Sequence, residues 1–191
     1  QQSVMKKVLE YGRMKGYLTE LPKIPKPKLV VNNRSDFTKE EWKKLYEYMR
    51  DWVNHKNGRI HRQRLYTQQY ILIMGNSGIR CGTESRNIKW GDISNTTDVL
   101  GEERVVISVD GKTNKRDVVC NVGIERYLKR LFDYRKSELN RSPMSTEYVF
   151  VNPNGLPIKS FKGSFNSLLT SVGLMYDSEG KRRSPYSLRH T

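Results

Sequence analysis

The chain has 191 residues, which is enough for one well-buried domain or for one domain with part of a neighbour. No apolar run approaches the roughly 20 residues that a membrane-spanning helix needs. The two cysteines, Cys81 and Cys120, form neither a disulfide framework nor a metal-ligand spacing, and each is expected to be a small, half-buried apolar residue. We therefore expect a cytoplasmic protein that holds no metal and needs no other cofactor.

Charge points to the kind of partner. Lys and Arg number 35 against 20 Asp and Glu, which gives a formal net charge of +15. Because the basic residues are spread along the chain, a folded basic face is favoured over a disordered basic tail. Nucleic acid is the expected partner, bound partly through its phosphates. An anionic membrane is a rival, but no helix has the required wide apolar face, and charge that serves only solubility is the plain alternative.

The first 35 residues divide into two segments. Apolar residues recur at helical spacing over residues 3–17, and Gly16 lies near the expected helix end. Three prolines at short spacing, Pro22, Pro25 and Pro27, then prevent helix and favour an extended linker. We expect residues 1–20 to be the last helix of a preceding domain, residues 21–35 a linker, and residues 36–191 the main domain.

The main domain is expected to open with helices. Thr38 and Glu41 form a capping box flanked by the apolar pair Phe37 and Trp42, so a helix should run over residues 39–54. A second helix is expected over residues 61–76. Glycines and polar residues at its C-terminal end should terminate it. A short helix over residues 83–88 should follow, which places Arg80 in the break just before a helix start.

The rest of the chain predicts a small sheet and more helices. Residues 104–109 and 117–122 are rich in β-branched side chains and should pair as a hairpin around turn-forming residues 110–115. Helices are expected over residues 124–136 and 160–172, a short strand over residues 148–151, and a further element from Pro185. The fold class is therefore mainly α with a small antiparallel β-sheet (α+β).

Three basic positions could carry chemistry, although each has an ordinary alternative. Arg80, between a glycine break and a helix start, can aim its guanidinium at an anion, or can be a solvated arginine paired with Glu84. Lys112 stands at the hairpin tip, where it can protonate a leaving oxygen or be a common surface lysine. Arg189 follows Tyr186 and precedes His190, a crowding that indicates either a phosphate site or a capped helix end.

Together, in this order, these motifs resemble the tyrosine recombinase (phage integrase) family. The resemblance rests on Gly78 to Ile93 and on Tyr186 to Thr191, and the segment from Glu10 to Pro25 is similar to the exit of the family's core-binding domain. It implies that Arg80 and Arg189 clamp the scissile phosphate of DNA. It also implies that Lys112 is the general acid. Fixed cations lower the barrier to attack on a phosphodiester without a metal.

The resemblance implies roles for three further residues and also shows departures. Glu84 would support the site, four residues after Arg80 where three is commoner. His190 would be a structural hydrogen-bonding residue. Tyr186 stands where many members carry a histidine, and a phenol, with a pKa near 10, is a poorer base at neutral pH. The family's nucleophilic tyrosine follows a few dozen residues after this box, so we expect that it is not in this chain.

The expected parent protein is a site-specific DNA recombinase or integrase. It would cut one strand of double-stranded DNA through a 3′-phosphotyrosyl intermediate and act as a homo-tetramer at its attachment sites, as the resemblance implies. The fragment alone should bind DNA and cleave nothing. The alternatives are a non-catalytic DNA-binding regulator or remnant, a type IB topoisomerase-like nicking enzyme, and an RNA-binding structural domain.

Overall fold

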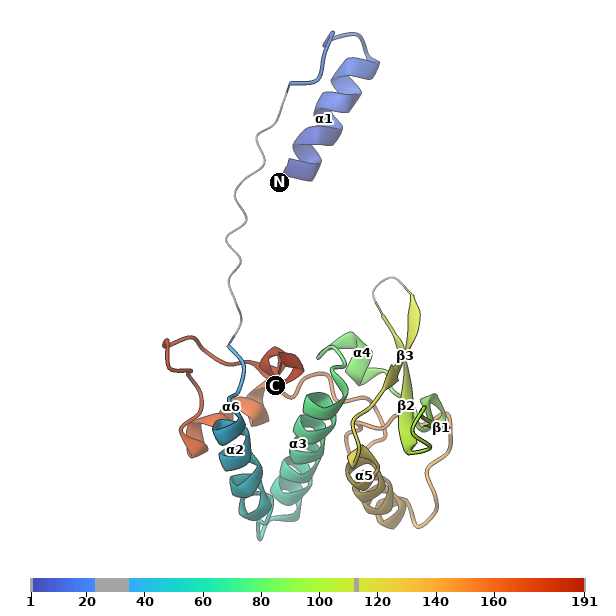
Figure 1. Ribbon diagram of the computed structural model, residues 1–191, viewed down its shortest axis with the longest axis vertical. Helices are drawn as coiled ribbons and strands as arrows, with labels where there is room; N and C mark the ends of the chain where they lie inside the picture. Colours follow the sequence, from blue (N-terminus) through green and yellow to red (C-terminus); the bar gives the residue numbers. More distant parts are fainter. Residues whose placement is uncertain (1, 23–34, 112–113, 191) are drawn as a thin grey trace. The chain divides into compact units, whose positions relative to one another are not determined.

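The computed structural model describes residues 2–22, 35–111 and 114–190, and the side chains of all of these except residues 2, 3 and 190. Contacts within the chain divide it into a smaller unit, Gln1–Asn33, and a larger unit, Arg34–Thr191 (Figure 1). Each unit is described here by itself. Among the described residues, no helix is long and apolar enough to span a membrane.

The smaller unit contains one helix, α1 (Gln2–Met14). The sequence predicted helix as far as residue 17, but α1 ends earlier. Gly16 has a φ of +75°, a left-handed conformation that ends a helix. The apolar side chains Val8, Tyr11 and Met14 are exposed within this unit. The predicted linker over residues 21–35 lies mostly outside the described residues.

The larger unit begins with α2 (Lys39–Trp52), whose capping is as predicted. The backbone N–H of Glu41 donates to Thr38 Oγ1 at 3.2 Å, and the N–H of Thr38 donates to Glu41 Oε2 at 3.0 Å. The rings of Phe37 and Trp42 pack with their centroids 6.1 Å apart. These contacts fix where the helix starts and how the chain enters it.

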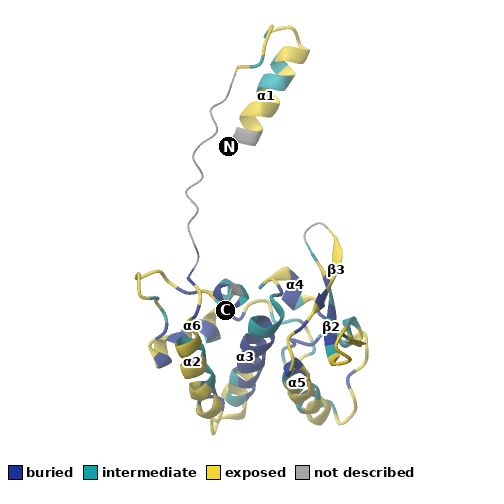
Figure 2. Ribbon diagram, viewed as in Figure 1, coloured by how far each residue is buried: buried dark blue, intermediate teal, exposed yellow. Residues whose placement is uncertain are grey.

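Helix α3 (Gly58–Ser77) is the centre of the larger unit and is buried along most of its length (Figure 2). It starts three residues before the predicted His61, because Asn57 caps it: Asn57 Oδ1 accepts hydrogen bonds from the N–H groups of Arg59 and Ile60. It packs against α5 (Ile124–Leu139), α6 (Lys162–Val172) and the 3₁₀ helix η2 (Pro185–His190).

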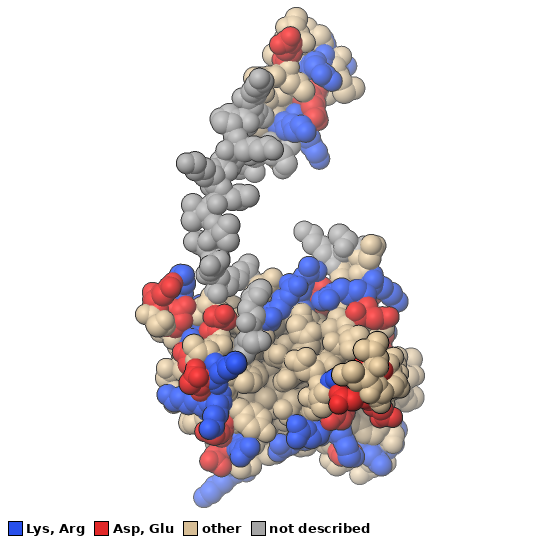
Figure 3. All heavy atoms as spheres, viewed as in Figure 1, with Lys and Arg blue, Asp and Glu red and all other residues tan. Residues whose placement is uncertain are grey.

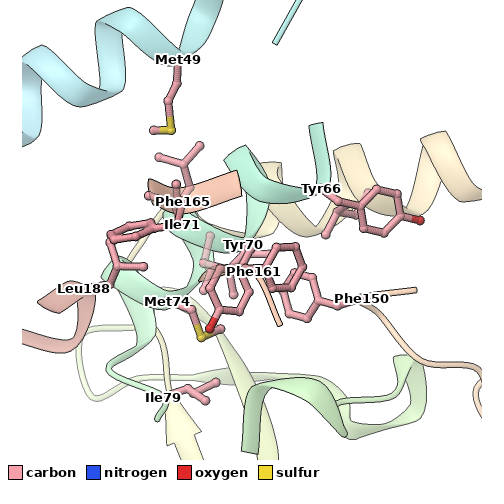
Figure 4. Packing of buried hydrophobic residues seen from close by; sticks show 14 of the residues in the cluster. Met49, Tyr66, Tyr70, Ile71, Met74, Ile79, Phe150, Phe161, Phe165 and Leu188 are labelled. Atoms are coloured by element: carbon pink, nitrogen blue, oxygen red, sulfur yellow. The ribbon is translucent and has the colours of Figure 1, made fainter. Parts of the chain in front are cut away.

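Aromatic side chains join these elements into one core (Figure 4). Tyr70 of α3 stacks on Phe161 at 4.0 Å between centroids and meets Phe150 edge to face at 5.3 Å. Leu188 of η2 is fully buried in the same cluster. Burying one such side chain contributes about 1.5–3 kcal/mol, so Leu188 fixes η2 firmly against α3.

The sheet has three antiparallel strands in the order β1 (Ile93–Thr97), β2 (Glu103–Asp110) and β3 (Lys115–Val119). The predicted hairpin is β2–β3, although β3 begins and ends earlier than expected. The sequence missed β1, which is polar and mostly exposed. It pairs with β2 through Ile93 opposite Ile107.

The remaining elements are short. Helix α4 (Thr83–Arg86) ends two residues before the predicted end, and a 3₁₀ turn, η1 (Trp90–Asp92), follows it. The predicted strand over residues 148–151 is wrong: Tyr148 and Val151 make only isolated bridges, because their partners Lys89 and Pro157 belong to loops. The predicted fold class, mainly α with a small antiparallel sheet, is confirmed.

Candidate active site

The loop that carries Arg80 joins α3 to α4 and is held at both ends. Gly78 ends α3 with a φ of +63°, and its N–H donates to Met74 O at 3.2 Å. Ile79 is fully buried in the core, so the loop cannot lift away from α3. Gly82 has a φ of +116°, a conformation that a side chain would strain. The backbone of Arg80 is therefore fixed while its side chain stays 47% exposed.

Glu84 is the acceptor around which this loop is organised. Its carboxylate is 5% exposed and accepts hydrogen bonds from the backbone N–H of Arg80 at 3.1 Å and from Arg80 Nη1 at 3.0 Å. A third donor is Arg116 Nη2 of β3, at 3.0 Å. One buried carboxylate thus holds two half-exposed guanidinium groups, and one positive charge remains in excess.

The ionisation of Glu84 follows from these contacts. Burial raises the pKa of its carboxyl group, but the hydrogen bonds from Arg116 and Arg80 outweigh that effect and hold the pKa below its ordinary value. Glu84 is therefore a charged acceptor at neutral pH, suited to positioning the arginines. The sequence analysis did not include Arg116, because only the pairing of β3 with β2 shows which hairpin residue faces α4.

The turn end of the β2–β3 hairpin lies close to the same carboxylate. A Cβ placed on Gly111 would be 3.5 Å from Glu84 Oε1, and the N–H of Gly111 donates to Asn114 O at 3.0 Å. Lys112, the predicted general acid, lies outside the described residues. Gly111, which directly precedes Lys112, is thus a neighbour of the Arg80–Glu84 pair.

The predicted second arginine lies on η2. Arg189 is partly buried, and its Nη1 donates to the hydroxyl oxygen of Tyr186 at 3.3 Å. Tyr186, predicted to replace a histidine, thus holds the guanidinium of Arg189. The backbone of His190 belongs to η2, but its side chain lies outside the described part of the chain.

Cys81 connects the two arginine-bearing segments. Its Sγ donates a hydrogen bond to the backbone carbonyl of Pro185, the first residue of η2, at 2.9 Å. Burial raises the pKa of its thiol, while a hydrogen bond from Tyr70 and the positive charge of Arg189 oppose that rise. Cys81, next to Arg80, is therefore within electrostatic range of Arg189 and remains a protonated thiol at neutral pH.

A hollow of about 260 Å³ opens beside this junction. Cys81, Gly82 and Ser85 line it from one side, and Pro185 and Tyr186 from another. Figure 3 shows Lys and Arg side chains across α4 and the neighbouring hairpin. Cations next to an open hollow suit a polyanion better than a neutral ligand.

The described residues contain no group of three or more His, Cys, Asp or Glu side chains that could hold a metal ion. Arginines and a charged carboxylate make up the site instead. Planar guanidinium groups can each bind two phosphate oxygens. The arrangement is thus able to bind a phosphodiester and to stabilise added negative charge on it.

Comparison with solved structures defines the class of fold. The chain superposes on the XerH site-specific recombinase bound to difH substrate, with a TM-score of 0.64 and 16% sequence identity, over 99% of this chain and 50% of that one. It superposes on XerA recombinase with a TM-score of 0.51 and 18% identity, over 97% and 56% of the two chains. The larger unit thus has the fold of a tyrosine recombinase catalytic domain.

A transposon integrase gives a similar result. The Tn1549 integrase, in complex with transposon right-end DNA, matches with a TM-score of 0.54 and 12% identity, over 95% of this chain and 60% of that one. The chain spans half to three fifths of the length of these relatives in structure. No family model and no curated protein matches the sequence.

Proposed function

We propose that this chain is the arginine-bearing part of a site-specific DNA recombinase or integrase. The observation that carries the proposal is the contact between Cys81 and Pro185, which joins the Arg80 loop to the Arg189 helix within a recombinase-like fold. The net charge of +15 supports double-stranded DNA as the partner. XerH and the Tn1549 integrase were both solved with DNA, which supports the same partner.

In the proposed reaction, Arg80 and Arg189 bind the non-bridging oxygens of the scissile phosphate. A tyrosine hydroxyl loses its proton to solvent as its oxygen attacks the phosphorus, the bond to the 5′-oxygen breaks, and the ammonium of Lys112 gives its proton to that oxygen. The product is a 3′-phosphotyrosyl ester and a free 5′-hydroxyl, and attack by another 5′-hydroxyl rejoins the strand. Glu84 and Tyr186 position the arginines, and His190 is a structural hydrogen-bonding residue. No metal or other cofactor is needed.

The proposal extends to the parent protein. Residues 1–20 would be the last helix of a DNA-gripping domain, residues 21–35 its linker, and residues 36–191 catalytic domain. A segment of the parent outside these 191 residues would provide the nucleophilic tyrosine, and four copies would act together on two DNA sites in the cytoplasm. These 191 residues alone would bind DNA without cutting it.

The test is covalent trapping by the full-length parent protein on a nicked suicide substrate that carries its attachment site. We expect a protein–DNA adduct that Arg80→Ala or Arg189→Ala abolishes. Lys129→Ala is the matched control, because Lys129 is an exposed cation of α5 that pairs only with Asp133 among the described residues.

Three other outcomes would each change the proposal. An adduct that persists in both arginine variants would remove the site assignment. Site-specific binding without any adduct would point to a non-catalytic DNA-binding protein. Relaxation of supercoiled DNA without site preference would indicate a topoisomerase-like enzyme.

A further inference from the structure

A row of inward-facing side chains on the β-sheet ends in an arginine. Successive residues of a strand point to opposite faces, and directly paired residues of antiparallel strands share a face. Val118 of β3 pairs with Ile107 of β2, and both are buried. Two residues nearer the turn, Arg116 pairs with Val109, which is also buried. Arg116 therefore occupies a position where the strand pattern predicts an apolar side chain.

The side chain of Arg116 meets a buried carboxylate instead of entering the core. Helix α4 packs against β2 of the hairpin (Figure 1), and Arg116 Nη2 donates to Glu84 Oε2 of α4 at 3.0 Å. Arg80 Nη1 donates to the other oxygen, Glu84 Oε1, also at 3.0 Å. Because both guanidinium groups are hydrogen-bonded to one carboxylate, they are neighbours in space although they come from different elements.

Glu84 does not need both arginines. Arg80 alone neutralises its single charge, and the backbone N–H of Arg80 gives the carboxylate a further donor at 3.1 Å. Arg116 adds a second positive charge, and among the described residues Glu84 is its only ion-pair partner. Two adjacent cations that share one anion repel one another, so binding of another anion stabilises the arrangement.

Arg116 is accessible to such an anion. Its side chain is 40% exposed, whereas the carboxylate that it binds is 5% exposed. A guanidinium group has five N–H donors in a planar fork. Within the described part of the chain, Arg116 gives one side-chain hydrogen bond to the protein, from Nη2. One nitrogen is thus held in place while the other donors are left for a ligand, and this reduces the entropy lost on binding.

We propose that Arg116 is a further phosphate-binding residue of the candidate active site, and that it binds the DNA backbone beside the phosphate held by Arg80. This inference rests on the proposed function, since the ligand is the same DNA. Each strand of duplex DNA offers a series of charged phosphates, so two neighbouring arginines can each bind one. Phosphate contacts set the register and orientation of a protein on the duplex. Arg116 thus helps to place the scissile phosphate at Arg80.

The rival is an indirect role, in which Arg116 only neutralises Glu84 so that Arg80 keeps its charge for the phosphate. The two roles differ in the salt dependence of DNA binding. Each phosphate contact increases the magnitude of the slope of log K against log salt concentration by about 0.9. An arginine with a phosphate of its own contributes to this slope independently of Arg80, whereas an indirect role contributes nothing once Arg80 is removed.

The test measures binding of this chain to a short DNA duplex of arbitrary sequence by fluorescence anisotropy over a series of NaCl concentrations. Arg116→Gln should reduce the slope by about 0.9, and the double variant Arg80→Gln/Arg116→Gln by about 1.8, twice the change of Arg80→Gln alone. Arg104→Gln is the matched control and should leave the slope unchanged, because Arg104 lies on the neighbouring strand β2 and is paired with Asp98 and Glu102. Urea unfolding checks that each variant is folded.

A measurement on the wild-type chain needs no variant. In NMR spectra, the side-chain Nε–H signal of Arg116 should shift when the same DNA duplex is added, and that of Arg104 should not. This readout remains decisive if removal of Arg116 unfolds the protein.

Three results would overturn the inference. The first is an unchanged slope in folded Arg116→Gln, and the second is an Nε–H signal of Arg116 that does not respond to DNA. The third is an equal slope for Arg80→Gln and the double variant, because Arg116 would then act only through Arg80. The covalent adduct formed by the parent protein tests the recombinase activity separately, so either proposal can fail while the other stands.

Discussion

The thiol of Cys81 donates a hydrogen bond to the carbonyl oxygen of Pro185, with 2.9 Å between Sγ and O, although 104 residues separate the two in the sequence. Cys81 directly follows Arg80, and Pro185 starts the 3₁₀ helix that carries Arg189. Because both segments are also anchored in the core through Ile79 and Leu188, this bond sets the spacing between them. Four predictions test the contacts that hold this part of the molecule.

Replacement of Cys81 tests the connection itself. Cys81→Val keeps an apolar side chain but removes the donor, so Pro185 O loses its partner, at a cost of about 1–2 kcal/mol in the free energy of unfolding. Cys81→Ser retains a donor and should lose less. Urea unfolding measures the stability, and hydrogen exchange of η2 amides should accelerate only in Cys81→Val. Equal exchange in the two variants would show that the bond does not hold η2.

Glu84→Gln tests the buried carboxylate. The variant should lose about 2 kcal/mol at pH 7, because two half-exposed arginines lose their charged acceptor. The folded-state pKa of Glu84 is depressed, so its stabilising contribution is complete above the ordinary glutamate pKa of about 4.3 and is lost as the pH falls below it. Urea unfolding from pH 7 to pH 3 should therefore show wild type and variant converging in acid. A constant gap would contradict this assignment.

Arg183→Met tests the buried arginine before η2. Arg183 is 2% exposed and donates to Asp36 O, Leu174 O and Tyr176 O and to Glu41 Oε2. Methionine fills similar space without donors and leaves these acceptors unpaired, so we expect a loss of about 3 kcal/mol. The exposed neighbour provides a control: Arg182→Met should change stability by less than about 0.5 kcal/mol. Thermal unfolding of both variants checks the difference.

Gly75→Ala tests the contact between α3 and α2. Alanine is favoured over glycine in a helix by about 1 kcal/mol. A Cβ at this position would, however, lie 2.6 Å from Trp42 Cη2. Overpacking of this kind costs about 1–3 kcal/mol, so the steric clash should outweigh the helix-propensity gain of alanine. The variant should therefore have a lower melting temperature than wild type.

Two further variants make this prediction specific. Gly163→Ala in α6, where nothing lies within 4 Å of the new Cβ, should not destabilise the protein. Addition of Trp42→Leu to Gly75→Ala should recover part of the loss beyond the effect of Trp42→Leu alone, as a double-mutant cycle would show. Additive effects would rule out the clash.

Local sequence signals predicted the helices well. The capping box of Thr38 and Glu41 fixed the start of α2, and the hydrophobic spacing located α3, α5 and α6 to within a few residues. The start of α3 was missed because Asn57 acts as a single-residue cap without a capping box. Strand β1 was missed because its residues are polar, and only pairing with β2 makes them a strand.

The candidate site was only partly predictable, because some of its contacts join residues that are far apart in the sequence. Arg80, Glu84, Tyr186 and Arg189 stand in recognisable local motifs. Arg116 belongs to no such motif, since its place beside Glu84 depends on the register of β3. Cys81 was predicted to be half-buried and apolar; it is partly buried, but its function as a donor to Pro185 depends on a contact far away in the sequence. Cys120 was also predicted to be half-buried, but it is 3% exposed and lies in the core.

The bond between Glu41 and Arg183 has a consequence for synthesis of the protein on the ribosome. Glu41 Oε2 accepts from the N–H of Thr38 and also from Arg183 Nη2, so one oxygen atom both caps α2 and closes a loop of 142 residues. A nascent chain that has emerged only as far as α6 lacks this closure and also lacks Leu188 in its core. Such a long loop forms slowly, so Arg80 and Arg189 should come together after translation has passed Arg189 rather than during it.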